Sequence, residues 1–295
     1  MTYSIVARDP ATGELGVAVQ SHWFSVGPIV PWAEPGVGAV ATQANVLPSY
    51  GPGALGLMRF GASAGEALER LVAEDSGSAG RQVAVVDAAG RVAVHTGSSA
   101  IPFAGHSTAD EVSCQANMMA SETVWPAMLD TYRQTGGSLT HRLLAALDAA
   151  EREGGDVRGR QSAAILVVPA NGDAWQNVVS LRVEDHPEPL VELRRLVDLH
   201  EAYALASEAD DCINEGRHDD AARLFERARA LAPDNHELLF WAGLGAAHAG
   251  DVERGVQDVR AAIELQPGWR ELLERVPPEV APSAQAVLER LTDSA

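Results

Sequence analysis

The chain has 295 residues, of which 46% are apolar and 21% are charged, and its formal net charge is −19 at pH 7. This length and composition suffice to bury the core of one large domain and a smaller one. The acidity argues against nucleic acid and anionic membranes as partners, because both bind basic surfaces. All 22 basic residues are arginines, which excludes Schiff-base lysines, pyridoxal anchors and phosphate-loop lysines.

Segments that would direct or tether the chain to a membrane are not evident in the sequence. No apolar run approaches the roughly 18 to 20 residues of a membrane-spanning helix, and the N-terminus lacks the basic and apolar regions of a secretory signal. We therefore expect a cytoplasmic protein with no membrane partner. Cys114 and Cys212 lie far apart, so we expect both to be reduced and structural.

Residues 1–195 alternate short β-branched runs with Gly and Pro, which indicates an α+β domain. The strands are apolar on both faces, as expected of sheets covered on both sides. Serines that precede apolar periodic segments predict helices over 63–75, 121–134 and 138–153, and residues 53–60 form another helical pattern. The predicted strands span residues 3–9, 14–21, 36–43, 81–87, 91–97, 111–117, 162–169 and 175–183.

Residues 196–295 read as almost continuous helix with an internal repeat. Gly216 recurs as Gly250, Ala228 as Ala262 and Pro233 as Pro267, each pair 34 residues apart. This period is similar to that of the tetratricopeptide family, although the second copy has glycine and valine where the first has Ala221 and Phe225. We expect two repeats and a last helix over 282–291, which serve packing, dimerisation or a protein partner.

The N-terminus itself carries the most reactive candidate group. The turn PATG predicts a hairpin in which paired positions sum to 23, so Thr2 faces Ser21, with His22 next to it. Removal of Met1 would give Thr2 a free α-amine of pKa about 7.7 to 8.0, a base within the same residue as the hydroxyl. The alternative is ordinary, since many proteins begin with Met-Thr.

Several ordered motifs resemble one family. TYSIVARDPATGELGVAVQS, PGVGAVATQANVLPSYGP, AGH followed by QANMM, GGDVRGRQSAAILVV and LRVEDHPEPLVELRRL are similar to domain of unknown function 1028. That family resembles the N-terminal nucleophile (Ntn) hydrolases, so the resemblance implies a four-layer αββα sandwich over about residues 1–197. It also implies that Thr2 is the nucleophile, at the start of the first strand.

The resemblance places further site residues around Thr2. The acidic residue of proteasome-like relatives falls near Gln20, and their catalytic lysine has no counterpart, which leaves proton transfer to the α-amine, water, Ser21 or His22. Gln43 and Asn45 occupy the turn where such enzymes present oxyanion donors, and Asn117 ends another strand. An equally weighted alternative is that Asn45 and Asn117 cap the elements that follow them.

Arg160, Gln161 and Ser162 enter a later strand, the position from which the superfamily supports its nucleophile. Arg160 is a candidate clamp for a substrate carboxylate, and the rival interpretation is an ion pair with Asp156 or Glu184. The nine histidines show no zinc spacing, and the sequence has no dinucleotide or phosphate-loop fingerprint, so we expect neither metal nor cofactor.

Two functions remain open at this point. The first is an Ntn-type amidohydrolase that cleaves a small polar amide, such as an acylated amino acid or a carboxylated ring-opened amide, through an acyl-enzyme on Thr2. The second is a non-catalytic descendant of the fold that binds ligands or assembles with protein partners through residues 196–295. A homodimer is expected in either case. A nucleophile at Ser4 after internal cleavage is disfavoured, because the cleavage would destroy the first strand.

Overall fold

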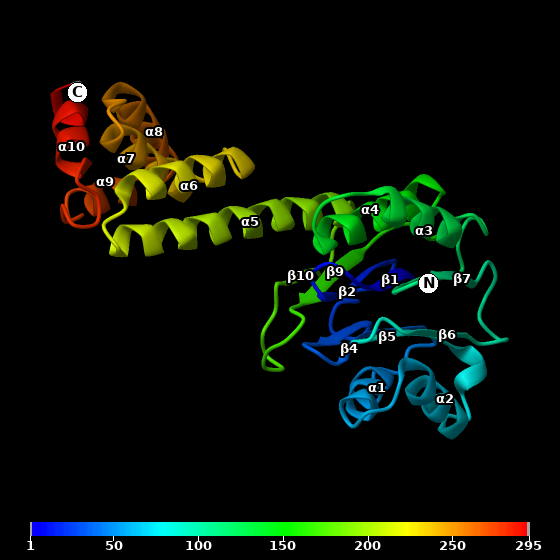
Figure 1. Ribbon diagram of the computed structural model, residues 1–295. Coiled ribbons are helices and arrows are strands. Elements are labelled where there is room, and N and C mark those ends of the chain that lie inside the picture. Colours follow the sequence, from blue (N-terminus) through cyan, green and yellow to red (C-terminus); the bar gives the residue numbers. More distant parts are fainter. Residues whose placement is uncertain (1, 294–295) are drawn as a thin grey trace. The chain divides into compact units, whose positions relative to one another are not determined.

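A computed structural model describes residues 2–293 of the chain. The chain divides into two compact units, with the boundary between Arg194 and Arg195 (Figure 1). The first unit combines α-helices with two antiparallel sheets, which confirms the predicted α+β class. None of the described helices is both long and apolar enough to cross a membrane.

The larger sheet has six strands in the order β10-β9-β2-β1-β8-β7. Its centre is the β1–β2 hairpin, in which Thr2 pairs with Ser21, so the predicted register is confirmed. β8 pairs with the other edge of β1 and places Asn117 opposite Thr2. The strands are β1 (Thr2–Arg8), β2 (Leu15–Ser21), β7 (Gly105–Ala109), β8 (Val112–Asn117), β9 (Ser162–Val168) and β10 (Val179–Val183).

The smaller sheet has the order β3-β4-β5-β6, from β3 (Pro31–Glu34), β4 (Gly38–Ala44), β5 (Arg81–Asp87) and β6 (Val92–Thr96). β3 and β7 were not predicted from the sequence. Both lie at sheet edges, β3 has only four residues and begins with proline, and β7 has the sequence GHSTA. Short, polar or proline-containing edge strands lack the apolar alternation by which strands are recognised.

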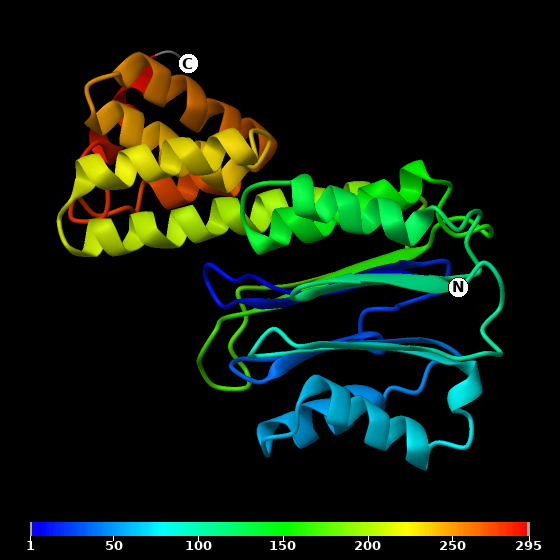
Figure 2. The ribbon, with the colours of Figure 1, turned by 45° about the vertical axis from the view of Figure 1, so that its right-hand side comes forward.

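Helices cover the outer faces of the two sheets, which face each other (Figure 2). On the six-stranded sheet lie α3 (Val124–Gln134) and α4 (Leu139–Arg152), and on the four-stranded sheet lie α1 (Tyr50–Arg59) and α2 (Ala64–Glu74), followed by the short helix η1 (Ser78–Gly80). Ser63 and Ser138 cap α2 and α4 as predicted. Ser121 does not cap α3, which begins at Val124. Instead the Ser121 hydroxyl accepts a hydrogen bond from the Thr123 N–H in the preceding turn.

The space between the two sheets contains an apolar region and a polar region. Valines and alanines from both sheets fill one region, with Val6, Val17 and Val86 among its fully buried members. Around the Thr2 end of β1 the facing residues are instead buried glutamines, an asparagine and hydroxyl groups. The sheets therefore pack through an apolar core toward one end and through hydrogen bonds at the other.

The second unit is helical, and its repeat has a structural cause. Gly216 and Gly250 follow α5 and α7 with φ angles of 73° and 101°, a left-handed conformation in which glycine is the favoured residue. α7 and α8 approach closely where Gly243 and Gly255 face each other. The helices are α5 (Pro189–Asn214), which begins earlier than predicted, α6 (His218–Leu231), α7 (His236–His248), α8 (Val252–Leu265), α9 (Gly268–Leu273) and α10 (Ala284–Asp293).

Candidate functional site

Thr2 lies at the end of the central strand between two polar neighbours. Ser21 on β2 and Asn117 on β8 are its direct partners, so the three side chains share one face of the sheet. The Thr2 hydroxyl oxygen lies 3.0 Å from that of Ser21, within hydrogen-bonding distance. Thr2 is 6% exposed, so nearly all of the residue is enclosed by protein.

Two side-chain amides hold the backbone of Thr2. The Gln43 Nε2 and the Asn117 Nδ2 each donate to the Thr2 carbonyl oxygen at 3.3 Å. Both amides also donate to one acceptor, the Gln82 Oε1, at 2.8 Å and 3.0 Å. Asn117 therefore uses its amide hydrogens to position Thr2, and Gln82 fixes the two groups that do so.

This polar network extends along β1 and β8 to Ser4. The Ser4 hydroxyl donates to the Gln43 Oε1 and accepts from the Gln115 Nε2, each at 2.6 Å. Ser113 donates to the Gln115 Oε1 at 2.8 Å. All of these residues are buried, and hydrogen bonds in a low-dielectric interior hold a polar cluster in one arrangement. Ser4 is fully buried and engaged on both sides, which argues further against it as a nucleophile.

A cavity of about 250 Å³ opens beside the Thr2 hydroxyl. One wall is the turn after β4, where Ala44 adopts a φ angle of 69°. A non-glycine residue in this region costs of order 1–3 kcal/mol, and such strain is concentrated at functional sites. The lining residues are Thr2, Ser21, Trp23, Val26, Ile29, Val30, Gln43, Ala44, Asn45 and Val46.

The backbone of Asn45 is fixed from both sides. Its N–H donates to the Gly80 carbonyl oxygen at 3.0 Å, and its carbonyl oxygen accepts from the Arg81 guanidinium at 2.5 Å. Arg81 in turn is paired with Asp75 at 2.9 Å, and this hydrogen bond, followed by one from the Gly77 N–H, lowers the pKa of Asp75. The Asn45 backbone N–H is thus engaged, and Asn45, an exposed residue, is among those that line the cavity.

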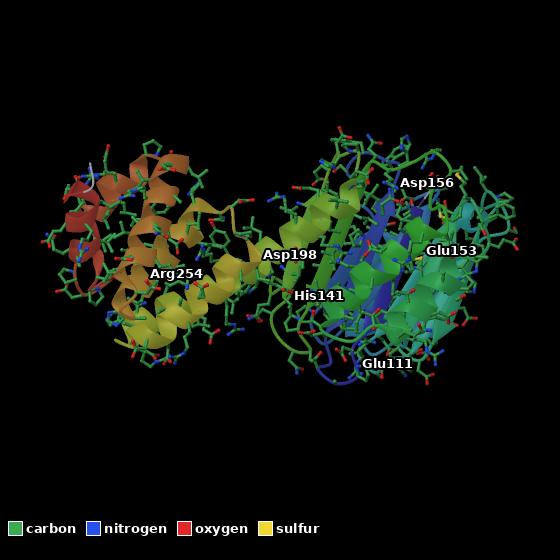
Figure 3. The ribbon with its side chains drawn as sticks, turned by 90° about the horizontal axis from the view of Figure 1, so that it is seen from above. Glu111, His141, Glu153, Asp156, Asp198 and Arg254 are labelled. Atoms are coloured by element: carbon green, nitrogen blue, oxygen red, sulfur yellow. The ribbon has the colours of Figure 1, made fainter. Side chains whose placement is uncertain are left out.

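The segment after β2 forms the opposite wall. The His22 N–H donates to the Asp156 carboxylate at 3.1 Å, and its ring Nδ1 lies 3.3 Å from the Arg160 carbonyl oxygen. The Ser162 hydroxyl donates to the Trp23 carbonyl oxygen at 2.6 Å and accepts from the Val26 N–H at 3.1 Å. His22 and Ser162 therefore hold this wall in place. Figure 3 shows Asp156 and Glu111 at opposite ends of the unit.

Arg160 and Gln161 lie outside the cavity. The Arg160 guanidinium binds Glu151 at 2.5 Å and also pairs with Glu188, so neither of its predicted partners was right. Asp156 pairs with Arg158 at 3.1 Å instead. The Gln161 side chain donates to Asp185 at 3.2 Å. Both side chains serve contacts between segments, and neither reaches the lining of the cavity.

Gln20 does not lie beside Thr2, contrary to the expectation from the family resemblance. It pairs with Tyr3 in the β1–β2 hairpin, so its side chain lies on the face of the sheet opposite to Thr2. On that face the Tyr3 hydroxyl donates to Glu151 of α4, and burial followed by the charge of Glu151 raises the Tyr3 pKa well above its ordinary value. The fully buried Gln20 amide has no hydrogen-bond partner among the described residues. It therefore does not contribute to the Thr2 site.

Gln82 and Gln115 were missed by the sequence analysis, which considered Ser4 only as a nucleophile. The available signal was a glutamine next to small or apolar residues within a predicted strand, as in RQVAVVD and VSCQAN. Buried amides of this kind need partners, and three strands that each supply one can satisfy them together. The sequence does not show that Gln43 and Asn117 converge on the Thr2 carbonyl oxygen, or that Gln82 joins their two amides.

The histidines and cysteines make structural contacts. His95 bonds the Ser78 carbonyl oxygen at 2.8 Å, and His106 lies 3.0 Å from the Thr96 hydroxyl, with a pKa lowered by burial and by His95. Cys114 is buried, which raises its pKa, and both cysteines are free thiols. Within residues 2–293, no group of three or more His, Cys, Asp or Glu side chains is arranged to hold a metal ion.

Comparison with known proteins identifies the first unit. The crystal structure of protein SPO2555 from Silicibacter pomeroyi, assigned to DUF1028, is similar to this chain with a TM-score of 0.61 and 33% sequence identity. The match covers 66% of this chain and 87% of the other. No curated protein sequence is significantly similar to the chain. The family of unknown function DUF1028 matches residues 2–193, well over half of the sequence, and the chain therefore belongs to that family.

Proposed function

We propose that the first unit is an Ntn-type amidohydrolase that uses the Thr2 hydroxyl as its nucleophile. The observation that carries the proposal is the position of this hydroxyl, at the end of a central strand, on the wall of a cavity and 3.0 Å from the Ser21 hydroxyl. The order of helices, sheet, sheet and helices agrees with the αββα sandwich of the Ntn hydrolases. Fold alone does not specify a reaction, so the site residues carry the argument.

The chemistry requires that Met1 be removed. The Thr2 α-amine then accepts the hydroxyl proton, directly or through Ser21, while the Thr2 oxygen attacks the amide carbonyl carbon. Collapse of the tetrahedral intermediate breaks the carbon–nitrogen bond, and the leaving amine takes the proton. Water then attacks the ester on Thr2 and releases the carboxylic acid, which returns the enzyme to its starting state.

The surrounding amides divide into two roles. Asn45 lines the cavity and is the proposed donor to the developing oxyanion, a contribution of about 3 kcal/mol for one well-placed donor. Gln43 and Asn117 are positioning residues, because their amides bind the Thr2 carbonyl oxygen. Holding a nucleophile rigidly against the reacting carbon lowers the entropy cost of the reaction.

Three forms of the protein test the proposal against a panel of small amides. The first is Thr2→Ala, the second retains Met1, and the third is the matched control Thr12→Ala, at the turn end of the same hairpin. The proposal predicts turnover in the wild type and the control, and none in the first two. Full activity of Thr2→Ala or of the Met1-bearing form would refute it.

A non-catalytic role is the second candidate, and the helical unit favours it. We propose that this unit contains two tetratricopeptide-like repeats, since Gly216 and Gly250 both end helices in the same conformation and Ala228 and Ala262 are both fully buried. A groove of about 590 Å³ lies along α6 and α7 and carries the charged side chains of Arg223, Glu226 and Arg254. Removal of residues 218–295 with retained amide hydrolysis would separate the two functions.

A further inference from the structure

The walls of the Thr2 cavity share one chemical property, which is neutrality. Trp23, Val26, Ile29, Val30, Ala44 and Val46 supply apolar surface, and the hydroxyl and amide side chains of the lining supply the polar part. Among the described residues that line the cavity, no side chain carries a formal charge.

The guanidinium groups near this end of the unit are committed to other partners. Arg81 is paired with Asp75, Arg158 with Asp156, and Arg160 with Glu151 and Glu188. A substrate carboxylate in the cavity would gain no ion pair from the side chains of the described lining, and an ion pair with the Thr2 α-amine would hold that amine protonated and block its action as the base. An unpaired charge in such a site is strongly disfavoured.

The reaction determines which part of the substrate occupies the cavity. The acyl group stays attached to Thr2 through both half-reactions, whereas the amine leaves after the first. The group that must fit beside the Thr2 hydroxyl throughout is therefore the substituent of the scissile carbonyl. Apolar walls stabilise this substituent by removing it from water, and the stabilisation grows with each methylene that is buried.

We propose, on the basis of the proposed function, that this cavity is an acyl site selective for a short, neutral, apolar acyl group. The substrates are then N-acyl compounds with short aliphatic or aryl acyl chains rather than carboxylated amides. This inference narrows the expectation from the sequence, in which Arg160 bound a substrate carboxylate. In the structure that guanidinium is occupied outside the cavity.

Binding tests the inference independently of turnover. Calorimetry on the Thr2→Ala protein, which would not consume an amide, compares hexanamide, acetamide and glutaric acid monoamide, whose chain ends in a carboxylate. We expect hexanamide to bind at least about tenfold more tightly than either of the others. Equal or tighter binding of the carboxylated amide, or no binding of hexanamide, would overturn the inference. Equal binding of N-hexylacetamide would overturn the assignment to the acyl side.

Two arginine substitutions supply a matched comparison. Val46→Arg introduces a cation into the lining and should invert the preference toward the carboxylated amide. Val157→Arg places the same cation on an exposed residue outside the lining and should leave the preference unchanged. An unchanged preference in Val46→Arg, or inversion in both variants, would overturn the inference.

Turnover separates this inference from the proposed function. Wild-type enzyme is assayed with hexanoyl and glutaryl p-nitroanilides of similar length. Absence of hydrolysis of both, together with preferential binding of hexanamide, would refute the amidohydrolase and leave the neutral acyl-sized site standing. Faster hydrolysis of the glutaryl compound would refute the acyl site and leave the amidohydrolase standing.

Discussion

Gln82 should be among the most important side chains for the stability of the first unit, although it does not touch the cavity. Its Oε1 accepts two hydrogen bonds, and its Nε2 donates to the Thr96 hydroxyl at 3.0 Å and to the carbonyl oxygens of Gly105 and Ala116 at 3.1 Å and 2.9 Å. Gln82→Met keeps the approximate volume and removes all five contacts.

The expected loss of stability follows from what each partner retains. Net values of about 0.5–1.5 kcal/mol for each hydrogen bond give a sum of about 2.5–7.5 kcal/mol. The Gln43 and Asn117 amides still have the Thr2 carbonyl as an acceptor, so we expect a loss near the lower end, about 3 kcal/mol. For a unit of this size that corresponds to a decrease in Tm of about 6–12 °C.

Calorimetry of the full chain measures the transition, and hydrogen exchange of β1 and β8 assigns it to the first unit. Gln161→Met is the matched control, since the half-buried Gln161 side chain donates one hydrogen bond, to Asp185. Its Tm should change by no more than about 2–4 °C, equivalent to roughly 1 kcal/mol. The reasoning would be refuted if Gln82→Met destabilised the protein no more than Gln161→Met.

Three further substitutions test the packing and electrostatics. Gly255→Ala should destabilise the helical unit by about 1–2 kcal/mol, although alanine has the better helix propensity, because the added Cβ would lie 2.5 Å from the Gly243 carbonyl oxygen. Urea unfolding measures the change in stability, and a gain in stability would contradict the close approach of α7 and α8. Gly56→Ala in α1 meets no atom within 4 Å and should instead stabilise the first unit by up to about 1 kcal/mol in the same assay, so a loss would contradict the open space. The hydrogen bond from Arg81 lowers the pKa of Asp75 in the folded state. The pair therefore stabilises the fold fully at pH values above about 3.9, the pKa of the Asp75 carboxyl in the unfolded chain, and this stabilisation is lost as the pH falls through the lower pKa of the folded state. Asp75→Asn should therefore lower Tm at pH 7 and have a diminishing effect toward acid, and a Tm difference independent of pH would contradict this.

Local sequence signals were sufficient to predict much of the secondary structure of the first unit. The PATG turn and the two apolar runs beside it set the β1–β2 register, and this register places Ser21 beside Thr2. The same register places Gln20 beside Tyr3, so its position on the opposite face followed from the sequence although the family resemblance pointed elsewhere. The alternation of side chains between the two faces of a strand placed Gln20 more reliably than the family resemblance did, because this alternation follows from backbone geometry.

The remaining features depend on contacts between segments that are distant in the sequence. Gln82 joins Gln43 and Asn117 only after two sheets have packed face to face, and no spacing along the chain encodes that meeting. Arg160 had several acidic residues within reach, and Glu151 on α4 became its partner through the packing of that helix. A charged group on a flexible side chain pairs with the opposite charges that the tertiary fold places near it, so proximity in the sequence did not predict the partner of Arg160.

The central claim, acylation of the Thr2 hydroxyl, can be observed directly by mass spectrometry. The native protein is incubated briefly with p-nitrophenyl hexanoate, quenched in acid and digested with pepsin at acid pH, where the protonated α-amine cannot take the acyl group from the hydroxyl, and the peptide that begins at Thr2 is analysed. The account predicts a hexanoyl group on this peptide, with Met1 absent, that hydroxylamine removes as expected of an ester. A peptide that retains Met1, or one that stays unmodified while the protein hydrolyses amides, would contradict the account.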